Sequence, residues 1–508
     1  MSAGESNGRD VQTHQTARNV VFVVLDTARK ASVSGETMPT LERLGEAGTT
    51  FERAFATAPW TVPSHAAMFT GTYTAEHGTH GGHTHLDCSL RTLPEAFQNA
   101  GYETVGVSNN TWITEEFGFD RGFDDLRRGW QYVQSDVDMG TVVRGEDLRE
   151  KLEATRGRLF DGNPLINLAN VLYSEVLQPT GDDGADRSTD WMVDWFQTRS
   201  DDRPFFLFCN YIEPHIAYDP PGEFAEHFLP DGWDVEEAMA IRQDPRAFDC
   251  EAYELTESAF AALHGLYRAE LAYVDSQLAR LCSGLENAGL WEDTLLVVCG
   301  DHGENIGDHG FFGHQYNLYD TVLHVPLVIH GGPFTGGGTR TDLVQLLDLP
   351  DTLLETVGID DPAFETQSHG RSLVAADVSQ RERERERERE AVYAEYVSPQ
   401  PPIERLEDRF GTLPDHVYTY DRRLRSIRTE RYKYVHGDDG FERLHDLERD
   451  PTEMTDITAK RPEKADRLRR RLEAHFDELE GVDSPATAQS VSKMREGTKE
   501  RLADLGYL

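Results

Sequence analysis

The first apolar run of the chain reads Asn19-Val-Val-Phe-Val-Val-Leu-Asp26. It is apolar at every inner position and rich in β-branched residues, which is typical of a strand buried on both faces of a parallel sheet. Runs of the same type follow at residues 204–211, 294–299 and 325–330, and a further strand is expected at 103–108. Residues 39–48, 91–102 and 257–288 have helical spacing between these runs. Strands that alternate with helices predict an α/β fold with a doubly wound, mainly parallel sheet.

The second half of the chain is divided by five tandem Arg-Glu pairs at residues 381–390. We interpret them as a solvated low-complexity linker. Beyond them, strands at 391–396, 424–428 and 432–436 and an amphipathic helix at 463–479 predict a smaller α+β domain. The predicted divisions are a disordered segment 1–18, a catalytic α/β domain 19–378, a linker 379–390, a C-terminal α+β subdomain 391–480 and a tail helix within 481–508.

The composition is strongly acidic. The 508 residues carry 91 acidic against 50 basic side chains, a net charge of −41, and only seven of the basic residues are lysine. This pattern favours a halophilic protein that stays soluble in concentrated salt, where the Debye length falls to roughly 3 Å at 1 M. An ordinary acidic cytosolic protein is the alternative. Either way, so negative a field disfavours nucleic acid and anionic membranes as partners.

The five cysteines form no close pairs and are odd in number, so neither a disulfide framework nor a zinc knuckle is indicated. The N-terminal eighteen residues lack the apolar core of a signal peptide, and no run reaches the roughly 18–20 apolar residues of a membrane span. We therefore expect a cytoplasmic protein; its oligomeric state is not readable.

Two predicted strands end in metal-binding residue types. Asp26 closes the first strand, and Asp301 and His302 follow the 294–299 strand. Ligands of open α/β sheets gather outside the carboxyl ends of the strands, and hard oxygens with one nitrogen suit Ca, Mg, Mn or Zn. Asp26 taken alone could equally cap a turn, but Asp301-His302 at the end of a second strand favours a divalent cation site.

A hydroxyl precedes another predicted helix, in Trp60-Thr61-Val-Pro63-Ser-His65-Ala-Ala-Met-Phe-Thr-Gly71. With a helix at residues 63–70, Thr61 would face unpaired backbone N–H groups and the positive end of the helix dipole, a position that binds anions and eases alkoxide formation. The alternative is that Thr61 only caps the helix. Ser64 is interpreted as structural.

These pieces together resemble the sulfatase family of the alkaline phosphatase superfamily, over roughly residues 19 to 475. The resemblance rests on the order of Val-Val-Leu-Asp26-Thr27-Ala-Arg29, Met38-Pro-Thr-Leu-Glu-Arg-Leu, Thr61-Val-Pro-Ser-His-Ala, Thr70-Gly71, His77-Gly78, Glu213-Pro-His215, Gly300-Asp-His-Gly-Glu304, His309-Gly-Phe-Phe-Gly-His314, Ile427-Arg-Thr-Glu-Arg-Tyr-Lys-Tyr434 and Leu444-His-Asp-Leu-Glu-Arg-Asp-Pro451. It implies the alkaline phosphatase type of fold, with Asp26, Asp301 and His302 as metal ligands and Thr61 bridging metal and substrate.

The chain departs from the family at the nucleophile. Most sulfatases have Cys or Ser at the position of Thr61, which is oxidised to formylglycine; the Cβ methyl of threonine excludes an aldehyde. Thr27 replaces a second acid, His65 an arginine and His314 a lysine, while residues 108–111 replace a Gly-Lys-Trp-His segment.

The replacements leave other groups for the chemistry. Asn109 or Asn110 could donate hydrogen bonds to a non-bridging oxygen of the substrate, and His215 and His314 are candidates to protonate the leaving group. Glu213, His215 or His314 could also complete a second metal site. We interpret the remaining histidines as structural or loop residues: His309, His330 and the group His77, His80, His83 and His85.

We therefore expect a metal-dependent hydrolase of small sulfuric or phosphoric esters in which Thr61 is the nucleophile, with His65, His215 and His314 in the catalytic site and Asn109 and Asn110 in the substrate site. A phosphodiesterase or phosphotransferase of the same superfamily is the first alternative, and a catalytically inactive binding protein is the second.

Overall fold

The computed structural model describes residues 17–131, 182–336, 338–374 and 389–480, with a few single residues besides. Its strands are β1 Asn19–Leu25, β2 Thr49–Phe51, β3 Ala54–Phe55, β4 Glu103–Ser108, β5 Asp125–Arg128, β6 Phe205–Tyr211, β7 Thr294–Gly300, β8 Asn305–Ile306, β9 Phe312–Gly313, β10 His324–Val325, β11 Leu327–His330, β12 Thr339–Arg340, β13 Val344–Gln345, β14 Ala391–Tyr396, β15 Leu424–Thr429, β16 Tyr432–Gly437 and β17 Glu442–Asp446. Its helices are α1 Pro39–Ala47, α2 Thr61–Thr70, α3 Thr74–His77, α4 Leu93–Asn99, α8 Ala185–Thr198, α9 Gly222–Phe228, α10 Val235–Met239, α11 Pro245–Asp249, α12 Glu257–Asn287, α13 Asp320–Leu323, α14 Leu349–Val357, α15 Pro362–Gln367, α17 Ile403–Phe410, α18 Asp415–Tyr418 and α19 Pro462–Glu480.

The main sheet has β1 near its centre. Within the described residues its order is β12-β2-β11-β7-β1-β6-β4-β5. β1 pairs in parallel with β6 and β7, so the residues after all three strands emerge at one edge. The predicted 325–330 strand is split at Pro326 into β10 and β11, and β11 runs antiparallel to β7. The mainly parallel α/β sheet predicted from the apolar runs is confirmed.

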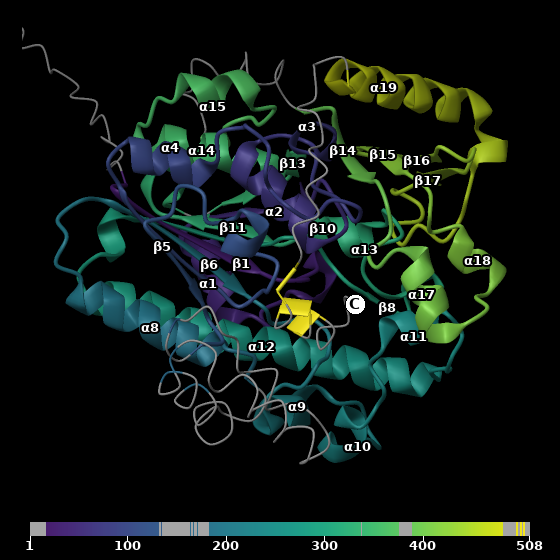
Figure 1. Ribbon diagram of the computed structural model, residues 1–508, viewed down its shortest axis with the longest axis horizontal. Helices are drawn as coiled ribbons and strands as arrows, with labels where there is room; N and C mark the ends of the chain where they lie inside the picture. Colours follow the sequence, from purple (N-terminus) through teal and green to yellow (C-terminus); the bar gives the residue numbers. More distant parts are fainter. Residues whose placement is uncertain are drawn as a thin grey trace, which may run out of the picture.

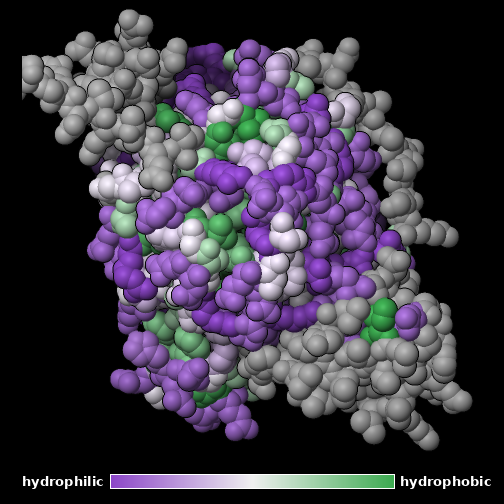
Figure 2. All heavy atoms as spheres, turned by 90° about the vertical axis from the view of Figure 1, so that its left-hand side faces the viewer, coloured by the Kyte–Doolittle hydropathy of each residue, from purple (hydrophilic) through white to green (hydrophobic). Residues whose placement is uncertain are grey.

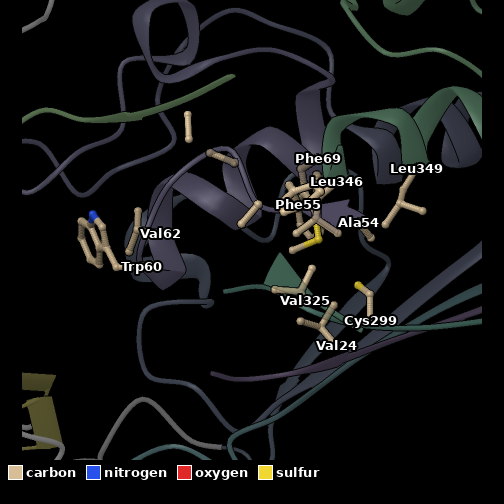
Figure 3. Close-up of a cluster of buried hydrophobic side chains, with 14 of the residues drawn as sticks. Val24, Ala54, Phe55, Trp60, Val62, Phe69, Cys299, Val325, Leu346 and Leu349 are labelled. Carbon is tan, nitrogen blue, oxygen red and sulfur yellow. The ribbon is translucent and has the colours of Figure 1, made fainter. Parts of the chain in front are cut away.

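Helices cover both faces of this sheet (Figure 1). α2, α4 and α14 lie over one face, and α1, α8 and α12 over the other. Because both faces are buried, every residue of β1, β6 and β7 is buried, as the unbroken apolar runs predict. Figure 3 shows the packing on the α2 side, where Val62 lies beside Trp60 and Phe69 lies with Phe55 and Leu346, above Val24 and Cys299 of the strands.

A smaller antiparallel sheet, β14-β15-β16-β17, forms the C-terminal domain. α19 packs on it (Figure 1). The buried residues of α19 recur every three or four positions and face the sheet: Ala465, Leu468, Leu472, Phe476 and Leu479. The three predicted strands and the helix are present, and β17 is an additional strand.

A buried ion cluster joins the two domains. Lys433 of β16 has no exposed side-chain surface and lies 2.6 Å from Asp320 Oδ1 and 2.9 Å from Glu453 Oε1. Arg428 Nε donates to Asp320 Oδ2 at 3.0 Å, and the Asp320 backbone N–H donates to Glu453 Oε2 at 2.6 Å. Asp320 is the first residue of α13, which follows the segment that carries His314, so the cluster fixes that segment to the C-terminal sheet.

Other predictions have mixed outcomes. The helix predicted at 63–70 begins earlier, at Thr61, and the one predicted at 91–102 spans only Leu93–Asn99. The disordered segment 1–18, the Arg-Glu linker and the tail helix fall mostly outside the described residues.

No helix in the described part of the chain is long and apolar enough to cross a membrane. The face in Figure 2 is largely hydrophilic with small hydrophobic patches, in keeping with the acidic composition.

Candidate functional site

Three side chains converge at the carboxyl edge of the main sheet. Asp26 follows β1, and Asp301 and His302 follow β7, its parallel neighbour. One ligand atom from each of the three lies within 4.8 Å of the other two. His302 Nε2 lies 3.4 Å from Asp301 Oδ2 and 3.9 Å from Asp26 Oδ1. Among the described residues this is the one group of three or more His, Cys, Asp or Glu side chains with such spacing.

Each carboxylate has one oxygen held by the protein and one without a hydrogen-bond partner among the described residues. Asn110 Nδ2 donates to Asp26 Oδ2 at 2.6 Å, while Asp26 Oδ1 has no partner. Asp301 Oδ1 accepts from the backbone N–H groups of Thr27 at 3.0 Å and His302 at 2.8 Å, while Asp301 Oδ2 has no partner. Buried carboxylate oxygens without partners are costly, so the residues present fit a bound cation.

The backbone around the ligands is unusual. Thr27, a β-branched residue, has φ of 60° in the left-handed region, a conformation that costs free energy and is concentrated at functional sites. This conformation accompanies its donation to Asp301. Gly300 approaches the Ala28 carbonyl so closely that a Cβ would lie 2.4 Å from that oxygen. Glycine is therefore required for the two strand ends to meet.

The electrostatics of the ligand group favour a positive charge. Burial, and then the charge of Asp301, raises the pKa of Asp26 well above its usual value. Burial raises the pKa of Asp301 to about 7 and lowers the pKa of His302 well below its usual value. A divalent cation beside two buried carboxyl groups and a neutral imidazole would stabilise the carboxylates in their charged form.

Thr61 lies beside this group as the first residue of α2. Its Oγ1 is 3.2 Å from His302 Nε2. His302 Nδ1 donates to the Gly303 carbonyl at 2.9 Å, so the lone pair of Nε2 is directed to Thr61 and the carboxylates. Ser64 Oγ donates to the Asp301 backbone carbonyl at 2.6 Å and so joins α2 to the ligand loop.

His65 lies one turn after Thr61 in α2 and is also fully buried. Its Nδ1 donates to the Thr61 carbonyl at 2.9 Å, and Asn210 Nδ2 donates to its Nε2 at 3.4 Å. Burial lowers its pKa to about 4. The ring of His65 is therefore uncharged at neutral pH.

His215 and His314 continue the site away from the carboxylates. The ring of His314 lies 4.6 Å from the ring of His302 and 5.2 Å from that of His215. Nδ1 of His314 lies 3.2 Å from Glu304 Oε1. Burial lowers the pKa of both His215 and His314 to about 3.

The neighbouring residues Asn109 and Asn110 have different partners in the structure. Asn110 contacts the ligand Asp26, whereas Asn109 Oδ1 accepts from Ser188 Oγ of α8 at 2.7 Å. The structure therefore brings Asn110 to the carboxylates and places Asn109 against the α8 wall.

This difference gives a matched test. We expect Asn110→Ala to weaken divalent metal affinity by about 10–100-fold, because the hydrogen bond that orients a ligand carboxylate is lost. Asn109→Ala should leave the metal affinity within about twofold of the wild type, because its partner is Ser188. Isothermal titration of metal-free protein measures both, and equal affinities of the two variants would contradict the assignment.

Three buried residues of the site, Asn210, Glu304 and Arg246, were given no role by the sequence predictions. Asn210 lies within β6, next to its carboxyl end, and could have been found by the rule that located Asp26. Glu304 contacts His314. Arg246 of α11 lies with its guanidinium 5.0 Å from the Tyr316 ring and donates to the Gln400 carbonyl at 3.0 Å. Its charge lowers the pKa of His314, after the larger effect of burial. α11 lies among short helices without a periodic signal.

The other histidines have partners outside the site. His309 stacks on Tyr319 with ring centroids 3.7 Å apart, and His330 lies 4.6 Å from Trp291. His77 contacts the Thr79 hydroxyl at 2.7 Å, and His83 pairs with Asp87 at 2.9 Å. None of the loop histidines joins a metal-type group in the described chain.

The chain is similar to several known proteins. The family model described as Sulfatase matches residues 18–359, and one described as N-sulphoglucosamine sulphohydrolase, C-terminal, matches residues 307–481. An arylsulfatase of Clostridium perfringens is 25% identical over 92% of this chain and 96% of its own. The solved phosphonate monoester hydrolase of Agrobacterium radiobacter superposes with a TM-score of 0.66 at 21% identity, over 91% of this chain and 96% of its own. Another solved structure, with a TM-score of 0.62 at 18% identity over 93% of this chain and 100% of its own, contains its substrate D-glucosamine-2-N,6-O-disulfate.

The Sulfatase model covers more than half of the chain, and the mainly parallel central sheet with a smaller antiparallel C-terminal sheet is the fold of the similar solved structures. The chain therefore belongs to the sulfatase family of ester hydrolases.

Proposed function

We propose that this enzyme is a metal-dependent hydrolase of small anionic esters of sulfuric or phosphoric acid, with Thr61 as its nucleophile. One observation supports the proposal above all: the Thr61 hydroxyl lies 3.2 Å from His302 Nε2, next to two buried carboxylate oxygens without hydrogen-bond partners among the described residues. A hydroxyl that only capped α2 would not need such a neighbourhood. Trp60, not Thr61, holds the N-cap position.

Asp26, Asp301 and His302 would hold the cation. When bound, a divalent cation supplies positive charge that lowers the pKa of a nearby hydroxyl and withdraws electrons from an ester oxygen. Asp26 Oδ2 and Asp301 Oδ1 remain bound to Asn110 and to the backbone, so the ligand side chains are fixed before the substrate arrives.

The chain's own groups then perform the transfer. Thr61 Oγ1 gives its proton to water and forms a bond to sulfur or phosphorus while the bond to the leaving oxygen breaks. His314 or His215 gives a proton to the leaving oxygen. Burial holds the pKa of both rings at about 3, and an anionic ester beside them would raise it. Water then hydrolyses the group bound to Thr61.

The nucleophile favours phosphorus over sulfur. A threonine ester of sulfuric acid has no aldehyde hydrate from which sulfate could be expelled. Phosphoryl transfer needs only an alkoxide that attacks phosphorus and a water that then hydrolyses the phosphoryl-threonine ester. A phosphodiesterase, or a phosphotransferase that passes the group to an alcohol, is therefore the second candidate for the same site.

A substrate panel tests the choice. Purified protein in concentrated salt would be assayed on an aryl sulfate, an aryl phosphate monoester and an aryl phosphodiester, each with Ca, Mg, Mn and Zn. We expect the highest kcat/KM with a phosphorus ester. Preference for the aryl sulfate would overturn the choice of phosphorus, and turnover of none of them would favour a binding protein.

Metal removal should abolish turnover and also lower the thermal stability of the protein. We expect chelation to stop hydrolysis and to lower Tm, because a cation at one hundred times its Kd stabilises the native state by about 2.7 kcal/mol. Asp301→Asn should lose metal-dependent stabilisation, while Asp308→Asn, a change at a partly exposed acid paired with Arg29, should keep it. Calorimetry with and without metal measures this, and an unchanged Tm difference in Asp301→Asn would count against the ligand set.

A further inference from the structure

A cavity lies between the catalytic domain and the C-terminal sheet, outside the residues assigned above. Its volume is about 170 Å³. A cavity of about 150 Å³ lined by apolar side chains holds a benzene ring, so this one accommodates a single six-membered ring with one substituent. All of its lining residues lie in the described part of the chain.

Aromatic rings from both domains form its walls. Phe311, Tyr316 and Tyr319 come from the segment on either side of His314, and Tyr420 and Phe441 come from the C-terminal domain. Tyr316 and Tyr420 are stacked with centroids 4.4 Å apart and an interplanar angle of 7°. Such walls favour a flat ring, because aromatic pairs are stabilised beyond their buried area.

Three aliphatic side chains also line the cavity. Leu318, Leu424 and Val435 are almost fully buried. No acidic side chain is among the lining residues. A lining of aromatic and aliphatic side chains with a few polar groups is the usual composition of a small-molecule site.

Two arginines supply positive charge to this cavity. Arg422 and Arg443 both line it, with their guanidinium carbons 4.8 Å and 4.7 Å from the Phe441 ring. Each has an acidic neighbour, Asp439 at 3.2 Å from Arg422 and Asp456 at 3.8 Å from Arg443. Arg422 also donates to the Thr419 carbonyl and Arg443 to the Glu442 carbonyl. Because a guanidinium has five N–H donors, each arginine can still donate to an incoming anion. In a chain with a net charge of −41, this lining presents two guanidinium groups and no acidic side chain to an occupant.

We propose that this cavity binds a single aromatic ring that carries one anionic group. The binding itself does not depend on the proposed function. It concerns that function only where the occupant is the organic end of an aryl ester substrate. Tyr316, which lines the cavity, is two residues from His314 and has the Arg246 guanidinium carbon 5.0 Å from its ring.

Benzoate is the probe, with benzyl alcohol as its neutral counterpart, titrated calorimetrically into the metal-loaded protein. Val435→Phe places a larger side chain in the cavity lining, and Arg443→Gln removes one positive charge from it. We expect the benzoate Kd to rise at least tenfold in Val435→Phe and about fivefold in Arg443→Gln. Arg431→Gln, which removes a similarly paired arginine that does not line the cavity, should leave the Kd unchanged.

Thr419→Tyr, at an exposed lining residue, blocks the cavity without a change in the core and serves if Val435→Phe does not fold. Unchanged benzoate affinity in the filled or blocked variants, or equal affinity for benzyl alcohol, would overturn the proposal. The KM for an aryl ester then separates the two sources. A parallel rise identifies the ring of the substrate, and a constant KM identifies a separate ligand. Benzoate binding does not require turnover, so it succeeds or fails independently of the reaction.

Discussion

Thr61→Val should lower kcat by about 10⁴-fold or more, the size of loss found when a covalent nucleophile is removed. Valine keeps the β-branch and nearly the volume of threonine, so α2 and its packing are retained. The change removes only the hydroxyl, which lies 3.2 Å from His302 Nε2. Thr61→Ala should be as inactive.

Thr61→Ser is the positive control, because it keeps the hydroxyl and loses one methyl group. We expect it to retain activity within about tenfold of the wild type, since the nucleophilic oxygen remains at the start of α2. Steady-state kinetics on the best ester of the substrate panel, with Tm measured for each variant, separates chemistry from folding. Activity of Thr61→Val close to that of the wild type would remove Thr61 from the mechanism.

The largest expected loss of stability comes from Lys433→Met. The variant leaves Glu453 without its cation and Asp320 with only Arg428, in a cluster where Lys433 has no exposed side-chain surface. Removal of one member of a buried ion pair costs about 3–5 kcal/mol, because the remaining charge stays desolvated. This is a large part of the 5–15 kcal/mol that typically separates folded from unfolded domains.

Lys460→Met is the control, because Lys460 is exposed and its change should alter stability by less than about 0.5 kcal/mol. Denaturant midpoints at one fixed salt concentration give the comparison. The double variant Lys433→Met with Glu453→Gln should recover part of the loss, since it removes the unpaired acid. A midpoint for Lys433→Met equal to that of Lys460→Met would show that the cluster contributes little.

The sequence was most informative where burial is uniform. β1, β6 and β7 are buried on both faces, so their apolar runs identified them, and the rule that ligands gather at strand ends then located Asp26, Asp301 and His302. β17 was missed because its residues, Glu442–Asp446, are mostly polar and only Leu444 and two neighbours are buried. Neither the antiparallel direction of β11 nor the pairing of distant strands follows from local pattern.

Individual contacts of the site depend on tertiary structure. Adjacent in sequence, Asn109 and Asn110 could not be told apart until the structure placed one against α8 and the other on Asp26. Arg246 and Lys433 are charged residues that sequence rules place at the surface, yet both are buried because neighbours far along the chain hold them. The family resemblance supplied the positions of Thr61, His215 and His314. In the structure, Thr61 and His314 lie beside His302, and His215 lies beside His314.

The central position of β1 has a consequence for biosynthesis. Its two neighbours are β6 and β7, which begin only at Phe205 and Thr294, so β1 leaves the ribosome long before either partner exists. Such long-range pairing slows folding and leaves strand edges open to aggregation. We therefore expect the β1 segment to need protection in the nascent chain, and Asp26 cannot meet Asp301 and His302 until residue 302 has been added.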